Sequence, residues 1–140
     1  MQTQRVLDEF KNEPFTDFSK PENAEAMRAA IEKVRGELGR EYTCLVNGER
    51  VSVGGKFKSF NPAKKDEVVG VFSEVDDDLS LVEKAIDAAT EAFKTWRFIP
   101  AAERAEYLFR IADIMRQRKH ELSAWMVFEV SKTWAEADGD

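Results

Sequence analysis

The sequence predicts a soluble domain of the α+β class, in which helices and strands occupy separate stretches of the chain. Apolar residues recur at helical spacing between Met27 and Leu38, and two short β-prone runs meet at an Asn-Gly dipeptide in the middle third. Helical spacing then returns after Asp76 and continues almost to the end. Strands and helices that follow one another in blocks are typical of α+β folds.

Composition sets the limits within which this fold must work. The chain has 140 residues, 34% of them charged, and a formal net charge of −6. That length is enough for a core without disulfides or metal, and the acidic balance does not favour a nucleic-acid partner. No apolar run approaches the roughly 20 residues that a membrane-spanning helix needs. Residues 1–5 lead into no signal-like segment, so we expect a cytoplasmic protein with no membrane partner.

The first 18 residues form the first organisational unit. Residues 1–18 show no lasting periodicity and predict an extended arm, whose Phe10, Phe15 and Phe18 dock against the rest of the chain, residues 19–140.

A helix is expected directly after the arm. Ser19 and Glu22 have the spacing of a capping box around Pro21. One face of this helix is apolar, and a glycine ends it; the residues concerned are Met27, Ile31, Val34, Leu38 and then Gly39.

The middle third is predicted to be β. Residues 43–46 and 49–53 pair as a hairpin, because Asn47-Gly48 suits the two positive φ values of a type I′ turn. A short strand near residues 57–60 ends at Asn61-Pro62, and residues 67–75 form a further strand.

Amphipathic helices fill the remainder. Asp76, Asp77 and Asp78 favour a helix start, where the dipole attracts anions, and an apolar face follows at Leu79, Val82, Ile86, Ala89, Phe93 and Trp96. Pro100 suits the first turn of the next helix, which is expected to be largely buried through Tyr107, Leu108, Ile111, Ile114 and Met115. A polar interruption at residues 116–121 precedes a last helical stretch with Leu122, Trp125, Met126 and Val130, and Gly139 is a stop signal.

Few residues offer chemistry. Cys44 has no nearby base and is interpreted as a buried, inert thiol, and His120 lies in a basic run that predicts a solvated position. The Asp76–Asp78 triplet could hold a cation, and the basic residues 116–120 could contact phosphates, but helix-start stabilisation and a solvated face explain them better. Gly54-Gly55 is only a loop, since no dinucleotide or P-loop pattern is present. The residues alone therefore indicate no catalytic, cofactor-binding or metal-binding residue.

Several short motifs, in a fixed order, resemble the amino-terminal portion of the aldehyde dehydrogenase superfamily. They lie at residues 45–49, 59–63, 67–70, 85–89 and 92–96. Within that superfamily, residues 10–15, 118–125 and 134–138 resemble the bacterial 1-pyrroline-5-carboxylate (L-glutamate γ-semialdehyde) dehydrogenases. One departure is Ser131 before Lys132, at a position where the family commonly has glycine. The backbone conformation at this position is therefore not predicted from the resemblance.

The resemblance implies an incomplete α/β dehydrogenase fold, with residues 19–140 as the first part of the dinucleotide-binding domain. The parent enzyme would oxidise L-glutamate γ-semialdehyde to glutamate with NAD in proline degradation. Its catalytic cysteine, general-base glutamate, oxyanion-holding asparagine and NAD loops follow the position of Asp140 in the family's order, so no role passes to Cys44.

Two hypotheses remain open. Either the chain is an inactive amino-terminal fragment of such an enzyme, or it is a free-standing, non-catalytic module that binds a protein partner through its apolar helix faces. Under the first, the remainder of the dehydrogenase is the partner, and the isolated chain self-associates through faces bearing Phe93, Trp96, Leu108, Ile111, Met115, Trp125 and Met126.

Overall fold

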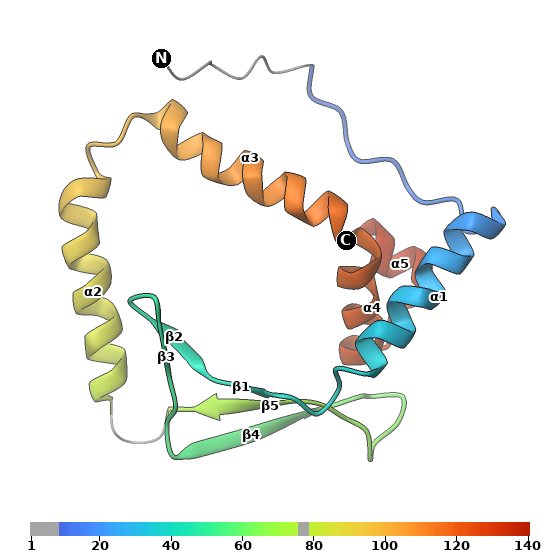
Figure 1. Cartoon of the computed structure of the whole chain (residues 1–140), viewed down its shortest axis with the longest axis horizontal. Coiled ribbons are helices and arrows are strands. Elements are labelled where there is room, and N and C mark those ends of the chain that lie inside the picture. The colour runs from blue at the N-terminus through green and yellow to red at the C-terminus, as the bar shows by residue number, and fades with distance from the viewer. Residues whose placement is uncertain (1–8, 76–78) are drawn as a thin grey trace.

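The computed structural model describes residues 9–75 and 79–140, and it confirms the α+β expectation (Figure 1). In chain order the elements of the described residues are α1 (Pro21–Arg35), β1 (Glu41–Tyr42), β2 (Cys44–Val46), β3 (Glu49–Val51), β4 (Gly55–Phe60), β5 (Val68–Glu74), α2 (Ser80–Trp96), α3 (Ala101–Gln117), α4 (Lys119–Val130) and α5 (Trp134–Gly139). The helices α1, α4 and α5 cluster together, whereas α2 and α3 extend away from them (Figure 1).

The three-stranded sheet has β5 at its centre. β5 pairs with β1 in parallel and with β4 in antiparallel orientation. The register places Tyr42, Phe72 and Phe57 side by side across the three strands, with ring centroids 5.2 and 5.5 Å apart. Such cross-strand aromatic contacts stabilise a sheet beyond the area they bury.

The predicted hairpin is present as β2 and β3. Cys44 lies opposite Val51, and the two turn residues both have positive φ, 50° at Asn47 and 79° at Gly48. These values are those that a type I′ turn requires, so the Asn-Gly signal is confirmed.

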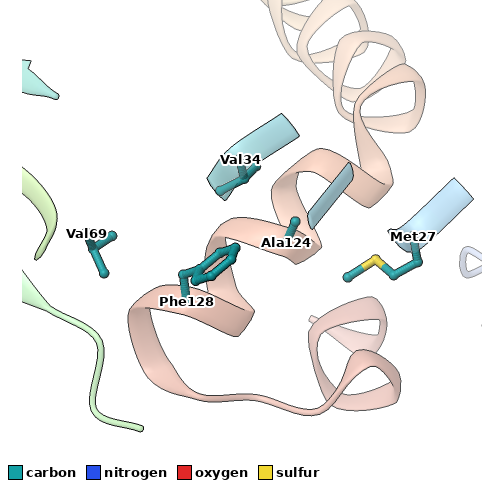
Figure 2. Packing of buried hydrophobic residues seen from close by; sticks show 5 residues of the cluster. All are labelled: Met27, Val34, Val69, Ala124 and Phe128. Atoms are coloured by element: carbon teal, nitrogen blue, oxygen red, sulfur yellow. The ribbon is translucent and has the colours of Figure 1, made fainter. Parts of the chain in front are cut away.

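The core lies where α1 and α4 meet the sheet. Figure 2 shows Met27 and Val34 from α1, Ala124 and Phe128 from α4, and Val69 from β5, all of which are buried. Met27 and Val34 are seven residues apart, and Ala124 and Phe128 four, so each pair lies on one face of its helix. The apolar face predicted at Met27, Ile31 and Val34 is therefore confirmed, whereas Leu38 lies past the end of the helix.

The ends of α1 differ from the prediction. The helix begins at Pro21 with Lys20 as its N-cap and without a side-chain cap, because the Ser19 hydroxyl donates instead to Asp17 Oδ1, 2.6 Å away. The helix ends at Arg35, before Gly39. Gly39 has a φ of 76°, and its N–H donates to the Val69 carbonyl, so this glycine serves the turn that leads into the sheet.

The expectation that α3 is largely buried was wrong. Neither α2 nor α3 contains a buried residue, and Leu108 on α3 is 68% exposed. Periodicity shows that one face is apolar, but it does not show that anything in the chain covers that face. Pro100 is the N-cap of α3 rather than a residue of its first turn.

Two further sequence features are placed as follows. The Asp76–Asp78 triplet lies outside the described residues. In the part of the chain that the structure describes, no helix combines the length and apolar character needed to cross a membrane.

Candidate functional site

The residues with reactive side chains lie in separate elements. Cys44 is on β2 and is half-buried, less so than a core thiol, while His120 is on α4. Within the described residues, no group of three or more His, Cys, Asp or Glu side chains is arranged to hold a metal ion. Cys44 lies opposite Val51 in the hairpin, and that no residue here is catalytic stays a prediction.

His120 is not solvated as predicted. Its ring centroid lies 6.3 Å from that of Phe18, and its Nδ1 atom is buried without a hydrogen-bond partner. The reason is that α4 begins at Lys119, inside the predicted polar interruption. His120 is four residues before Ala124, so helical geometry places it on the side of α4 that faces the core.

The arm is fixed by a cluster that we call the arm clasp, formed by Thr16, Lys119 and Asp138. The Thr16 N–H and hydroxyl donate to the two Asp138 carboxylate oxygens, at 2.7 and 2.6 Å. Lys119 Nζ lies 2.9 Å from Asp138 Oδ1 and donates to the Thr16 hydroxyl at 3.0 Å. These charge-assisted hydrogen bonds join the arm to α4 and α5, which lie far away in the sequence.

The carboxylate at the centre of the clasp is almost fully enclosed. The Asp138 side chain is 1% exposed. Burial by itself raises the pKa of Asp138, but hydrogen bonds from Thr16 and Lys119 outweigh that effect and lower the pKa below its ordinary value. Asp138 is therefore a buried, charged and fully paired group at neutral pH.

The aromatic residues of the arm behave differently from one another. Phe18 packs edge-on against Trp134 of α5, with centroids 5.6 Å apart, and joins the core. Phe10 and Phe15 remain 86% and 80% exposed. Of the three phenylalanines expected to dock, only Phe18 contacts the core.

The basic run at residues 116–120 is occupied by carboxylates of this chain. Arg116 donates to Glu13 of the arm at 2.6 Å. Arg118 and Lys33 pair with Glu121, and the Arg118 hydrogen bond is the largest cause that lowers the pKa of Glu121, to about 2. Ion pairs within the chain thus engage Arg116, Arg118 and Lys119 of this run.

The junction between α4 and α5 defines the backbone conformation that Ser131 adopts. Ser131 caps α4 in the left-handed region, with φ 56° and ψ 33°, a conformation that favours glycine. Thr133 and Glu136 then form a capping box at the start of α5, with the Thr133 N–H donating to Glu136 at 2.8 Å. The Thr-x-x-Glu spacing is the usual sequence signal of such a box, and it was overlooked at residues 133–136.

The apolar faces of α2 and α3 are uncovered, as the resemblance implies. Phe93, Leu108, Ile111 and Met115 are each more than half exposed. By contrast, Trp125 of α4 packs against the core, while Val130 at the end of this helix is 52% exposed.

The sequence and the fold of this chain are similar to those of known proteins. The model of the aldehyde dehydrogenase family matches residues 50–140. The 1-pyrroline-5-carboxylate dehydrogenases of Halalkalibacterium halodurans (form 1) and Geobacillus thermodenitrificans are 50% and 48% identical over 96% of this chain. A crystal structure of 1-pyrroline-5-carboxylate dehydrogenase from Thermus with bound NAD matches 96% of the chain with a TM-score of 0.90 and 40% identity.

In each of these comparisons the chain spans 26% of the relative's own length. The motif series and the structural match agree over the hairpin, the sheet and the helices that follow, and the family model covers this region from residue 50 onward. This chain belongs to the aldehyde dehydrogenase family.

Proposed function

We propose that the chain is the amino-terminal part of an NAD-dependent dehydrogenase that oxidises L-glutamate γ-semialdehyde to L-glutamate in proline degradation. The observation that carries this proposal is the 50% identity, over 96% of the chain, to a 1-pyrroline-5-carboxylate dehydrogenase. The likeness to the NAD-bound Thermus structure supports NAD as the cofactor of the whole protein. In this proposal, residues 19–140 begin the dinucleotide-binding domain and residues 1–18 form its arm.

The residues present do not fit a dinucleotide site by themselves. No Gly-x-Gly-x-x-Gly pattern occurs in the 140 residues, and this pattern is what lets a backbone approach a pyrophosphate at a helix N-terminus. We therefore place NAD binding in the part of the enzyme that follows Asp140. When bound, NAD accepts the hydride that leaves the substrate as the aldehyde is oxidised.

The reaction also needs a nucleophile and a base, and in this proposal both belong to the part of the enzyme that follows Asp140. Aldehyde oxidation of this type uses a thiolate activated by its surroundings. Cys44 lies within the hairpin strand β2, and its partner across the hairpin is the apolar Val51, which cannot act as a base. The described residues instead form a frame: the core fixes α1, α4 and the sheet, and the arm clasp fixes the end of α5.

Extending the chain along its gene tests the proposal. We expect the reading frame to continue past Asp140 into a segment with a catalytic cysteine, and the purified full-length protein to form NADH from NAD and pyrroline-5-carboxylate. A stop codon directly after Asp140 would favour the free-standing, partner-binding module instead. A full-length protein that folds but forms no NADH with this substrate would contradict the assigned reaction.

A further inference from the structure

The tip of the hairpin places an asparagine side chain next to an accessible backbone nitrogen. Asn47 and Gly48 are both exposed and are the two central residues of the turn between β2 and β3. The hairpin register pairs Val46 with Glu49 on either side of them. In a hairpin with a two-residue turn, the bonds between the strands belong to the flanking residues. The Gly48 N–H is therefore not used by the ladder of the hairpin.

The surroundings of this turn are open. A β-carbon built on Gly48 would meet no atom of the described residues within 4 Å. Asn47 lines a hollow between the hairpin and α2, which lie beside each other (Figure 1). Water therefore reaches both residues of the turn.

The Asn47 side chain and the Gly48 nitrogen can react with each other. The nitrogen attacks the side-chain amide carbon Cγ, so that an N–Cγ bond forms, the nitrogen loses its proton and the side-chain nitrogen leaves as ammonia. Water then adds to one of the two carbonyl carbons of this cyclic imide and breaks its bond to the ring nitrogen. The product is aspartate or, when the main chain is left running through the side-chain carbon, isoaspartate. Water is the sole co-reactant, and no electrons are transferred.

The turn allows this attack after one local rearrangement. The φ values of 50° and 79° define a type I′ turn, in which ψ of the first central residue is about 30° and the next nitrogen points away from its side chain. In a type II′ turn this ψ is about −120°, which brings the nitrogen beside Cγ. A flip of the Asn47–Gly48 peptide exchanges the two types, and both close a two-residue hairpin. Gly48 permits the flip because glycine adopts either sign of φ.

The other asparagines of the chain lack this combination. Asn61 is 7% exposed, and it precedes Pro62, whose nitrogen carries no proton that it could lose. Asn23 lies within α1, where the helix fixes the backbone. Asn12 precedes a glutamate, whose side chain hinders an attack by the backbone nitrogen. The reaction is therefore expected at the hairpin tip before any other asparagine.

We propose that Asn47-Gly48 is a self-modification site, at which the hairpin tip converts asparagine into aspartate and isoaspartate. Isoaspartate adds a carbon atom to the main chain, which a two-residue turn does not accommodate. The new carboxylate also joins a hollow that Lys84, Asp87 and Glu91 of α2 already line, so it meets more negative than positive charge. The modified hairpin is thus less stable than the original one. This site does not depend on the reaction of the whole enzyme.

Peptide mass spectrometry of the full-length protein, aged in mildly alkaline buffer, tests the proposal. Trypsin releases residues 41–50 as one peptide, because Arg40 and Arg50 flank it. This peptide should gain the mass that turns a side-chain amide into a carboxyl group, at least about tenfold faster than the peptides with the other asparagines, since glycine leaves the attacking nitrogen unhindered. Fragmentation and methylation by an isoaspartate-specific methyltransferase identify isoaspartate. Asn47→Gln is the matched control, because its longer side chain would have to close a larger and less favourable ring.

Each outcome supports or overturns the site. A mass gain confined to residues 41–50, with isoaspartate present and absent from Asn47→Gln, supports it. No gain in this peptide, or an equally fast gain at Asn12, would overturn it. Urea denaturation then compares the aged protein with Asn47→Asp, which carries the new charge without the extra main-chain carbon. The aged protein should have the lower midpoint, and equal midpoints would contradict the predicted loss of the turn. Mass is measured without any assay of activity, so failure of the proposed reaction is distinguished from failure of the site.

Discussion

Replacing Ser131 with glycine should stabilise the protein. Ser131 ends α4 with φ 56° and ψ 33°, and it is exposed. A β-carbon in this left-handed conformation crowds the neighbouring backbone, and glycine removes that crowding.

The size of the gain follows from two opposing effects. The left-handed conformation costs an ordinary L-residue roughly 1–2 kcal/mol. Glycine loses more conformational freedom on folding than serine does, and this entropy loss offsets about 0.5–1 kcal/mol of the stabilisation. Ser131→Gly should therefore raise the free energy of unfolding by about 0.5–1 kcal/mol, or a few degrees in Tm for a domain of this size.

Urea denaturation of Ser131→Gly beside Ser131→Ala measures this effect. Alanine keeps the β-carbon, so its midpoint should stay close to that of the unaltered protein. If alanine stabilises as much as glycine, the hydroxyl and not the backbone is responsible. If glycine gives no gain, the left-handed cap at Ser131 is not strained, and the reasoning fails.

Three further predictions concern the hairpin, the arm clasp and an ion pair. Gly48→Val should lower the free energy of unfolding by at least about 1 kcal/mol, because the φ of Gly48 is 79°. Gly54→Val should lower it little, since Gly54 has neither a positive φ nor a close neighbour. Equal urea midpoints for the two variants would refute the turn assignment. Asp138→Asn leaves Lys119 without its charged partner and should release the arm, which trypsin would then cleave faster at Lys11. The control Asp140→Asn should leave the cleavage rate at Lys11 unchanged. An unchanged rate in both variants would mean that the clasp does not hold the arm. Arg118 and Lys33 lower the pKa of Glu121 to about 2 from 4.5, so this group stabilises the fold above pH 4.5 and loses its contribution as the pH falls toward 2. Glu121→Gln should therefore reduce the dependence of the urea midpoint on pH between pH 4.5 and 2. If the midpoint of this variant falls with pH as steeply as that of the unaltered protein, another carboxyl group causes the acid sensitivity.

The sequence was most informative where the signal is local. The Asn47-Gly48 turn depends on two adjacent residues that tolerate positive φ, and the buried face of α1 depends on the spacing of Met27 and Val34. The turn was predicted correctly because it needs no distant partner, and the apolar face of α1 was recognised from its spacing alone, although Ala124 and Phe128 of α4 are what cover it.

The remainder depends on distant contacts, which the sequence does not reveal. Lys119 and Asp138 come from different helices and contact Thr16 of the arm. No spacing pattern in the sequence predicts that these three residues lie together. His120 was misplaced because the start of α4 decides which side of the helix it occupies. For α3, an apolar face at Leu108 was interpreted as a buried one, although what covers such a face is a property of the whole protein.

Turnover by the two lengths of chain tests the central claim that residues 1–140 provide a frame and no reactive group. NADH formation from pyrroline-5-carboxylate and NAD is followed for residues 1–140, for the full-length protein, and for full-length Cys44→Ser. We predict no NADH from residues 1–140 and equal rates from the two full-length proteins, because Cys44 is a residue of strand β2 that pairs with Val51 in the hairpin. Turnover by residues 1–140, or its loss on Cys44→Ser in a full-length protein that remains folded, would contradict this account.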